Sequence, residues 1–426
     1  MMPTDRFDRQ LPVLLDELAQ PRTPDYFDEL LGLTARTRQR SAWTFIERWL
    51  PMVDIARQPA FARQVPWRPI AVLALILVLL AASLLFVIGS QPRVPAPFGL
   101  ARNGLVAYAA GGDIYTADPT TGATKVVVAG PETDLGPVFS LDGARLAFER
   151  KAADGSGRLY VVKVDGTELT EVTREPLVGI TAYAFSPDGR DMVISAGPES
   201  KLGIHVAKND GTGVRMMPTA SQAMEPAWRP PDGAEVLYTG FDAWGFGGLY
   251  AFDADTGKVR TILEPSTGRY RGSAKWSPDG SQIAYNEWVD SNDMTVRTHI
   301  IAADGTGDRV LATHPDVRWE AFKAWSNDGK RLITARGYTG LGDDVRVAVV
   351  PVDGSNLGVE IEYPGSVQLE CCSSWEWAPD DTTILGIPTD ASGQALSQVM
   401  LDPKTGKSRT VPWSTNSYPA WQRLAP

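Results

Sequence analysis

One short motif recurs six times between residues 139 and 380: an aromatic residue, a turn built from Ser, Pro, Asp and Gly, and an alternating strand. The motif Asp residues lie 46, 44, 47, 49 and 52 residues apart along the chain. This spacing is typical of repeats in which each copy forms one four-stranded blade of a propeller. The copies are Phe139–Gly143, Phe185–Gly189, Trp228–Gly233, Trp276–Gly280, Trp325–Gly329 and Trp377–Asp381.

Tight turns rich in Asp, Thr and Gly follow the third strand of each repeat, and there are seven of them. Residues with this composition tolerate the positive φ angles of hairpin turns. The extra turn belongs to Leu105–Gly130, which supplies three strands without a first one, whereas Ser417–Arg423 supplies a first strand with nothing after it. We therefore expect an all-β, seven-bladed propeller whose C-terminal strand closes the first blade and hides the edge strands.

These repeats resemble the TolB-type, WD-like propeller repeats of bacterial envelope proteins, whose consensus is an aromatic residue, Ser, Pro, Asp and Gly before a strand. The resemblance covers roughly residues 100–426. It implies the propeller fold. Propellers host binding, scaffolding and catalysis alike, so the repeats say little about function.

The nineteen residues from Ile70 to Ile88 contain neither a charge nor a Pro. At about 1.5 Å per residue, a helix of that length nearly spans a bilayer core of roughly 30 Å, so we expect a transmembrane helix. Arg residues are more numerous before the run than after it, which predicts a cytoplasmic N-terminus. The predicted order is a cytoplasmic helical segment (1–67), the span (68–90), a Pro-rich linker (91–103) and an extracytoplasmic propeller (104–426).

Charge divides at the same boundary. Residues 1–68 hold ten Arg and nine acidic residues, which leaves 31 basic and 42 acidic residues for the remainder, a net charge of −11. An acidic external domain argues against nucleic acid as a partner. It is compatible with a protein, peptide or glycan ligand, and also with an acidic surface that serves solubility.

The cytoplasmic segment shows apolar residues at helical spacing, which form candidate faces for a protein partner. Its layout with one span and an external domain resembles that of membrane-bound anti-sigma factors, which implies a sigma factor as a candidate partner. The segment lacks His and Cys and so departs from the zinc-binding version of that family. An anchor with another partner stays open. The candidate partner-binding residues are Leu11, Leu14, Leu15, Leu18, Phe27, Leu30 and Leu31.

Enzyme interpretations find little support. The repeats also resemble the propellers of prolyl-oligopeptidase-type hydrolases, but no Gly-x-Ser-x-Gly occurs in the chain. The three His residues fall in different repeats, so we expect no catalytic triad, no metal site and no cofactor. Asp253–Gly257 superficially resembles a calcium loop but lacks the distal Glu, so we expect an ordinary turn. The adjacent Cys371 and Cys372 form either a vicinal disulfide or two free thiols.

We letter the four strands of a blade a to d in order, with strand a before the motif turn and strand b after it. In a propeller, the loops from strand b to strand c and from strand d to the next strand a share one face, which we call the top face. Aromatic and charged residues in these loops of blades 4 to 6 could hold a peptide or stack on sugars. The candidate ligand-binding residues are Trp244, Phe246, Arg269, Tyr270, Arg271, Trp288, Asp290, Asp293, Arg318, Trp319, Glu320, Tyr338, Asp343 and Asp344.

Together these features predict a membrane-anchored, extracytoplasmic binding or sensory module in the bacterial cytoplasmic membrane, which relays envelope state to a cytoplasmic partner such as a sigma factor. Two alternatives remain. One is a passive TolB-like scaffold for assembly in the envelope, and the other is an accessory propeller of a hydrolase system.

Overall fold

The computed structural model describes residues 71–80, 98–198, 201–219, 222–289, 295–338, 345–361, 375–388, 396–413, 417–418 and 420–425. The chain divides into two compact units, Met1–Gly89 and Ser90–Pro426. Within the first unit, residues 71–80 form a helix. Among the residues that the structure describes, no helix is both long enough and apolar enough to cross a membrane. The cytoplasmic residues predicted to bind a partner lie outside the described ranges, as do Cys371 and Cys372.

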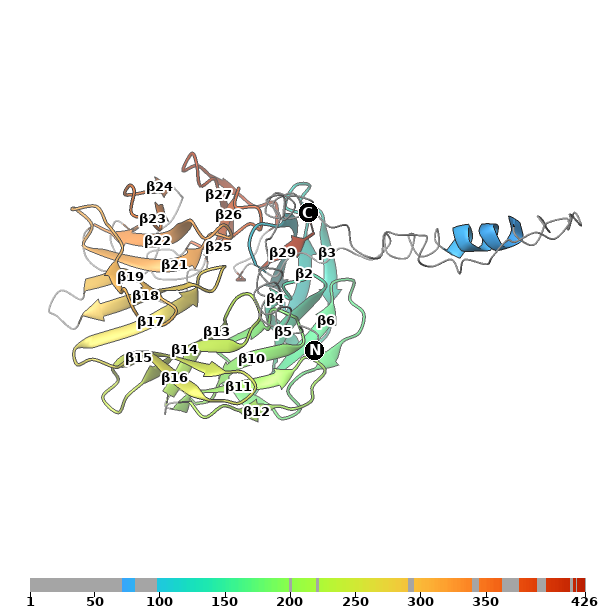
Figure 1. Ribbon diagram of the computed structural model, residues 1–426, viewed down its shortest axis with the longest axis horizontal. Helices are drawn as coiled ribbons and strands as arrows, with labels where there is room; N and C mark the ends of the chain where they lie inside the picture. The colour runs from blue at the N-terminus through green and yellow to red at the C-terminus, as the bar shows by residue number, and fades with distance from the viewer. Residues whose placement is uncertain are drawn as a thin grey trace, which may run out of the picture. The chain divides into compact units, whose positions relative to one another are not determined.

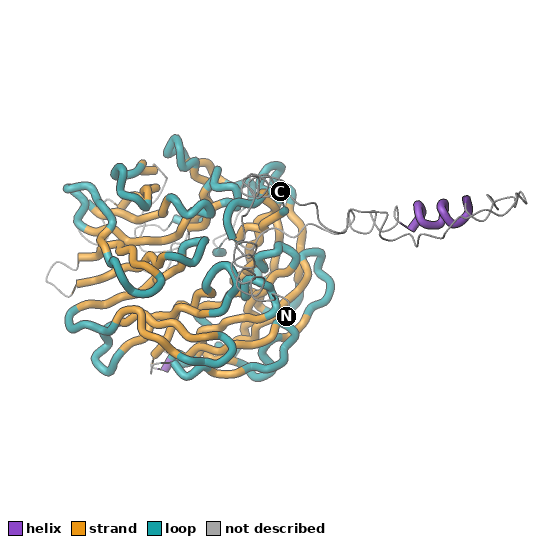
Figure 2. Tube along the Cα trace, in the orientation of Figure 1, coloured by secondary structure: helices purple, strands orange, loops and turns teal. Residues whose placement is uncertain are grey.

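The second unit contains seven antiparallel sheets, and Figure 1 shows them following one another around the molecule from β1 to β29. Strands a contact one another between most successive sheets, which places them around the central channel. Figure 2 shows the strands joined by loops and turns throughout this unit. Each sheet is therefore one blade, and the predicted seven-bladed propeller is confirmed.

In the first four blades strand a is innermost, and the other strands follow outward. Blade 1 is β29 (Ala420–Leu424), β1 (Arg102–Ala110), β2 (Asp113–Ala117) and β3 (Thr124–Val128). Blade 2 is β4 (Thr133–Phe139), β5 (Arg145–Lys151), β6 (Ser156–Lys163) and β7 (Thr170–Glu171), with β8 (Leu177–Val178) paired to β6. Blade 3 is β9 (Ala182–Phe185), β10 (Asp191–Ala196), β11 (Gly203–Lys208) and β12 (Arg215–Met216). Blade 4 is β13 (Gln222–Trp228), β14 (Glu235–Phe241), β15 (Gly247–Asp253) and β16 (Val259–Leu263).

The last three blades follow the same order. Blade 5 is β17 (Arg269–Trp276), β18 (Gln282–Val289), β19 (Thr295–Ala302) and β20 (Arg309–Val310). Blade 6 is β21 (Trp319–Trp325), β22 (Arg331–Gly337), β23 (Val345–Pro351) and β24 (Val359–Ile361). Blade 7 is β25 (Trp375–Trp377), β26 (Ile384–Gly386), β27 (Val399–Leu401) and β28 (Ser408–Thr410).

The ring closes through blade 1. Strand β29 pairs with β1, with Val106 opposite Trp421 and Ala107 opposite Ala420. The buried apolar residues form clusters between neighbouring blades, and one of them joins Tyr108 of blade 1 to Leu385 of blade 7. Because side chains alternate along each strand, each blade contributes one face to the cluster before it and one to the cluster after it. The predicted closure by the C-terminal strand is confirmed.

The repeated motif is explained by the turn between strands a and b. In blade 2, Ser140 Oγ donates to Asp142 Oδ1 at 2.5 Å and accepts from Arg145 N at 3.0 Å. The same Asp accepts from Ala144 N, and Gly143 takes a φ of 71°. The Ser and Asp side chains thereby bind the turn's backbone, and Gly supplies the left-handed conformation. These contacts give the Ser-Pro-Asp-Gly residues a structural role.

Three of the four motif Trp residues join neighbouring strands a through their indole N–H groups. The indole N–H of Trp228 donates to the carbonyl of Ala184 at 3.2 Å, and that of Trp276 donates to Ala227 at 3.2 Å. Trp325 repeats the contact with the carbonyl of Lys275 at 3.1 Å. Each bond runs from one blade to the blade before it, so the Trp side chain both fills the core and fixes the spacing of the blades.

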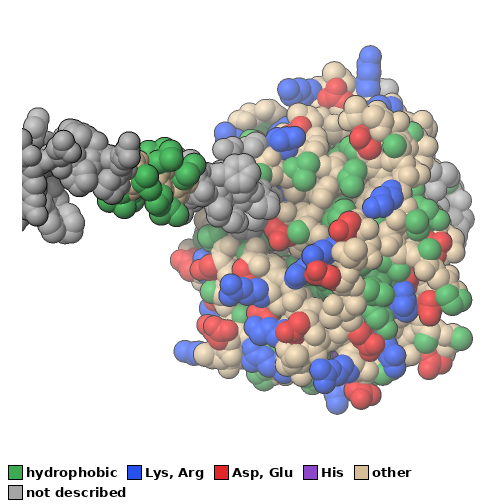
Figure 3. All heavy atoms as spheres, turned by 90° about the vertical axis from the view of Figure 1, so that its right-hand side faces the viewer, with side chains coloured by type: hydrophobic (Ala, Val, Ile, Leu, Met, Phe, Trp, Pro, Cys, Tyr) green, Lys and Arg blue, Asp and Glu red, His purple; other side chains and the backbone are tan. Residues whose placement is uncertain are grey.

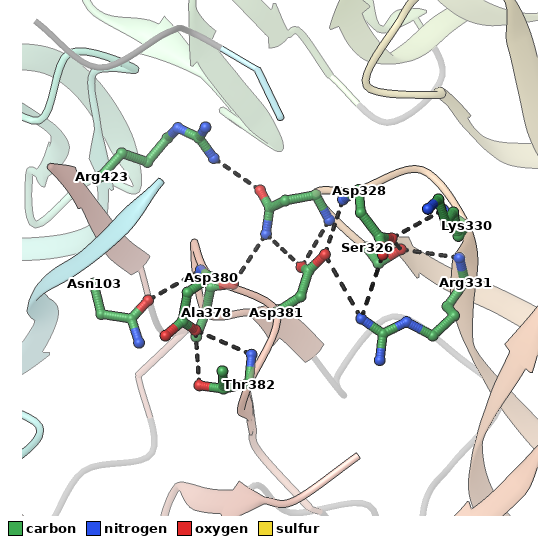
Figure 4. Close-up of polar contacts among 11 residues, drawn as sticks. Asn103, Ser326, Asp328, Lys330, Arg331, Ala378, Asp380, Asp381, Thr382 and Arg423 are labelled. Atoms are coloured by element: carbon green, nitrogen blue, oxygen red, sulfur yellow. Dashed lines mark hydrogen bonds and ion pairs between the residues drawn. The ribbon is translucent and has the colours of Figure 1, made fainter. Parts of the chain in front are cut away.

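Blades 6 and 7 depart from the motif together (Figure 4). Blade 6 has Asn327 at the motif position where four other copies have Pro, and blade 7 has Asp381 where the other five have Gly. Asp381 has a φ of 58°, and its carboxylate accepts from Asn327 N, Asn327 Nδ2 and Asp328 N, each at 2.8 Å. Arg423 of the closing strand donates to Asn327 Oδ1 at 2.8 Å. We call these three residues, Asn327, Asp381 and Arg423, the turn latch.

Candidate functional site

The loop between β14 and β15 presents an aromatic side chain to solvent. The carboxylate of Asp242 accepts hydrogen bonds from the backbone N–H groups of Trp244 at 2.8 Å and Phe246 at 2.9 Å. These bonds fix the loop as an Asx-type turn. The Trp244 side chain is 82% exposed, although Trp residues are highly buried on average. The loop therefore holds a large apolar ring in water on a braced backbone.

This loop lies directly against blade 5. A Cβ atom at Gly247 would lie 2.5 Å from the carbonyl oxygen of Arg271, so only Gly permits the approach. The ring of Phe246 contacts that of Tyr270, with centroids 5.4 Å apart. Tyr270 is 37% exposed and the Arg269 side chain 47% exposed. Trp244, Phe246, Arg269 and Tyr270 together form what we call the aromatic surface, on the top face across blades 4 and 5.

Buried charges support the aromatic surface from beneath. Glu287 pairs with Arg269 and with Arg271, whose Nε lies 2.9 Å from its carboxylate. Arg271 also donates to the carbonyl of Glu264 in the loop that leaves blade 4, at 2.6 Å. Because Arg271 and Glu287 are both nearly buried, their ion pair joins strands β17 and β18 within blade 5, and the bond of Arg271 to Glu264 ties the loop from blade 4 to them, while Arg269 reaches solvent.

The other residues predicted on the top face separate into different environments. Trp319 and Glu320 lie within β21 and are buried, with Glu320 Oε1 accepting from Arg336 Nε at 2.9 Å. Neither side chain reaches the surface, because the strand begins at Trp319 where a loop was expected. The hydroxyl of Tyr338 donates a hydrogen bond to the carboxylate of Glu360. Arg318 is exposed. Asp290, Asp293, Asp343 and Asp344 lie outside the described residues.

The central channel contains a cavity of about 830 Å³. Its walls come mainly from strands a of blades 3 to 6 and from the turns that follow them, with Trp288 and Phe98 adding aromatic rings. Phe98 also lines a neighbouring cavity between the turns of blades 2, 6 and 7, so the described propeller chain begins at the bottom mouth of the channel. The bottom mouth lies at the opposite end of the blades from the aromatic surface.

Two ionisable side chains stand out in the channel wall. In five blades the residue before the motif aromatic, or before Trp421 in the closing strand, is Ala or Val, but it is Lys275 in blade 5 and Glu376 in blade 7. Burial raises the pKa of Glu376 to about 8, although Trp421 N donates to it at 3.3 Å. Burial also lowers the pKa of Lys275, and this effect is larger than the opposite effect of the negative charges of Glu225 and Glu376. Lys275 is exposed to the channel, yet protein surrounds its side chain, and the pKa shifts move both groups toward their neutral forms.

Backbone bulges direct side chains into the channel. Strand a is bulged against strand b in blades 2, 4, 5 and 6. Glu225 and Ser273 occupy equivalent bulge positions with φ of 56° and 54°, and Ser273 N donates to Glu225 at 2.5 Å. Our sequence analysis missed the cavity, although comparing the repeats position by position would have singled out Lys275 and Glu376.

The segment resembling a calcium loop is a turn. Asp253 Oδ1 accepts from Thr256 N and Thr256 Oγ1, both at 2.7 Å, and the other turns of this class bind their own Thr or Ser in the same manner. The hydrogen bonds from Thr256 hold the pKa of Asp253 below its usual value. The carboxylate is therefore occupied by its own turn.

Comparison with known proteins gives the fold and no family. No protein-family model matches the chain, and no curated protein sequence matches it. An oligogalacturonate lyase solved in complex with manganese is 17% identical, with a TM-score of 0.53 over 73% of this chain and 86% of the lyase. A prolyl endopeptidase is 14% identical, with a TM-score of 0.53 over 75% of this chain and 51% of the enzyme.

TolB from Acinetobacter baumannii is 18% identical, with a TM-score of 0.44 over 77% of this chain and 68% of TolB. That score is too low to carry an argument, and the other two likenesses show only the β-propeller fold. The TolB-like seven-bladed propeller inferred from the repeats thus agrees with these structures and with the observed sheets. Membrane anchoring and the anti-sigma-factor layout stay predictions.

Proposed function

We propose that this protein is a binding protein whose propeller recognises a protein partner through the aromatic surface. The observation that carries the proposal is the 82% exposure of Trp244 on a loop fixed by Asp242. Trp, Tyr and Arg are the residue types that dominate binding energy at protein interfaces, and the surface presents all three. A braced loop also loses little conformational entropy when it binds.

The charge on the propeller is consistent with such a partner. On the face shown in Figure 3, basic and acidic side chains are interspersed rather than gathered into a patch of one sign. A mixed surface gives little attraction for a polyanion such as nucleic acid. On a surface of mixed charge, the specificity for a partner depends on shape and on a few anchor residues, which the aromatic surface provides.

In this proposal the apolar run Ile70–Ile88 tethers the propeller to the cytoplasmic membrane, with the propeller outside. The amphipathic pattern of residues 1–67 supports a second partner in the cytoplasm, for which a sigma factor is our candidate. Binding outside would affect that partner only by favouring one of two states of the chain, such as free or associated.

Photo-crosslinking would test the aromatic surface. A photoreactive amino acid replaces Trp244 in the native host, and the matched control carries it at Met216, which is 64% exposed on blade 3. We expect a discrete adduct from position 244 alone. The protein identified in it should bind the purified wild-type chain at least about tenfold more tightly than Trp244→Ala, with Met216→Ala unaffected. Equal affinities for all three proteins would refute the proposal.

The cytoplasmic partner is tested separately. Immobilised residues 1–67 are used to retain proteins from a lysate of the native host, and the bound proteins are identified by mass spectrometry. A stoichiometric sigma factor that is lost when Leu14 and Leu18 become Asp would support the regulatory role. A bait that circular dichroism shows to be folded, and that retains no sigma factor, would reduce residues 1–67 to an anchor.

A further inference from the structure

A separate cavity opens on the top face, away from the aromatic surface. It measures about 620 Å³ and lies among blades 1, 2 and 3. Its walls are mostly small or apolar, including Ala109, Pro137, Ala182 and the ring of Tyr418, which is 48% exposed. Among the described residues that line this cavity, Glu149 is the only Asp, Glu, Lys, Arg or His.

In two other repeats a polar residue at this strand position is satisfied within the propeller, whereas the hydroxyl of the buried Thr239 in blade 4 makes no hydrogen bond among the described residues. Glu149 is the fifth residue of strand b in blade 2, as Ser195 is in blade 3 and Asn286 is in blade 5. Ser195 Oγ accepts from Thr181 Oγ1 at 3.0 Å. Asn286 binds both the N–H and the carbonyl of Phe322, at 2.6 and 3.1 Å. These two side chains satisfy their polar atoms within the propeller.

Glu149 differs from both of them. Its carboxylate forms no hydrogen bond or ion pair with any residue in the described part of the chain. One of its oxygens packs so closely on Gly157 that a Cβ there would lie 2.2 Å away. The nearby hydroxyl of Tyr183 is not available, because it donates to the carbonyl of Gly136 in the β4 bulge. Lys151, two residues along the strand, makes no ion pair with it.

The surroundings of Glu149 leave it short of solvation. Burial raises its pKa, and the charge of Lys151 lowers it by less. The pKa of Tyr183 is also raised. Burial is the larger cause, and the negative charge of Glu149 adds to it. Glu149 is only partly buried, so its carboxylate is accessible from the cavity, and a cation that enters would supply the partner that the described residues do not. A divalent metal ion requires several oxygen ligands, which these apolar walls do not offer.

We propose that this cavity, the Glu149 pocket, binds the protonated amino group of a small organic amine. The ammonium group pairs with the Glu149 carboxylate, and the apolar part of the ligand lies against the Ala and Pro walls beside the Tyr418 ring. The pocket is separate from the aromatic surface, so an experiment that tests this site does not depend on the proposed protein partner.

Ligand-observed NMR with the full-length protein tests the pocket, using benzylamine as the probe and benzyl alcohol as its neutral counterpart. We expect saturable binding of benzylamine and binding of benzyl alcohol that is at least about tenfold weaker. Glu149→Gln should weaken benzylamine binding by about tenfold or more, whereas Glu149→Asp should retain part of it. The control is Glu168→Gln, an exposed carboxylate paired with Lys163, which should change nothing.

Circular dichroism confirms that each variant is folded. Equal affinity of benzylamine for wild type and a folded Glu149→Gln variant would overturn the proposal. Equal binding of benzylamine and benzyl alcohol to the wild type would do so as well, because the charge would then contribute nothing.

Discussion

Replacing Asp381 by Gly restores the repeat motif in blade 7 and should nevertheless destabilise the protein. The substitution removes a carboxylate that is 5% exposed and accepts three N–H groups from Asn327 and Asp328 (Figure 4). Asn327 then loses the acceptor of its backbone N–H and one of the two acceptors of its side-chain amide, and this residue is the one to which Arg423 donates. A consensus argument from the motif alone would predict the opposite sign.

The magnitude follows from those contacts. A hydrogen bond to a charged group contributes about 1.5–3 kcal/mol, and the three together contribute less than their sum because they share one acceptor. Burying the carboxylate costs part of that gain, and burial does raise the pKa of Asp381. Gly at a φ of 58° recovers roughly 1 kcal/mol of backbone strain. We expect a net loss of about 3 kcal/mol in the free energy of unfolding.

Urea unfolding followed by Trp fluorescence measures this loss. With a slope of about 3 kcal/mol per molar urea, the midpoint of Asp381→Gly should fall by about 1 M. Asp232→Ala is the matched control, since that motif Asp accepts only the N–H of Ala234, at 3.1 Å, on an exposed turn. A midpoint for Asp381→Gly that matches wild type or the control would refute the idea that the latch is stabilising.

Two further predictions concern buried charges. Because the folded-state pKa of Glu376 is about 8 and the unfolded value is near 4.5, the native state binds the extra proton between these pH values. The free energy of unfolding, measured by urea titration, should therefore fall by about 3 kcal/mol as pH rises from 6 to 9. Glu376→Gln should lose this pH dependence. The same pH dependence in wild type and Glu376→Gln would contradict the assignment. Arg336→Met leaves the buried Glu320 unpaired and should cost about 3–5 kcal/mol, whereas Arg336→Met combined with Glu320→Met should recover most of it by thermal unfolding.

The fold was predictable because each repeat is stabilised by contacts between residues that are close in the sequence. The Ser and Asp of the motif bind their own turn, and each Gly takes the φ that the turn requires, so the pattern survives in a single sequence. The mismatch between seven turns and six motifs also predicted that the C-terminal strand completes the first blade, which the pairing of β29 with β1 confirms.

The candidate sites were less predictable, since they depend on where strands begin and where they bulge. Trp319 and Glu320 were assigned to a loop, but β21 starts at Trp319 and turns both side chains into the blade. The bulges at Glu225 and Ser273 place residues other than Gly at positive φ, so no sequence signal marks them. Trp244 was found because a hairpin loop between two alternating strands must be exposed.

Departures from a repeat are of two kinds in this chain, and the distinction separates structure from function. Asn327 and Asp381 depart from the motif, but each satisfies the other, so the pair is explained within the fold. Glu149 departs from its neighbours Ser195 and Asn286 and finds no partner among the described residues. A partly buried carboxylate that the fold leaves without a partner has lost some of its hydration, and a cationic ligand that binds it would offset that free-energy cost. Position-by-position comparison of blades therefore identifies candidate ligand sites without homologous sequences, provided that departures satisfied inside the ring are set aside first.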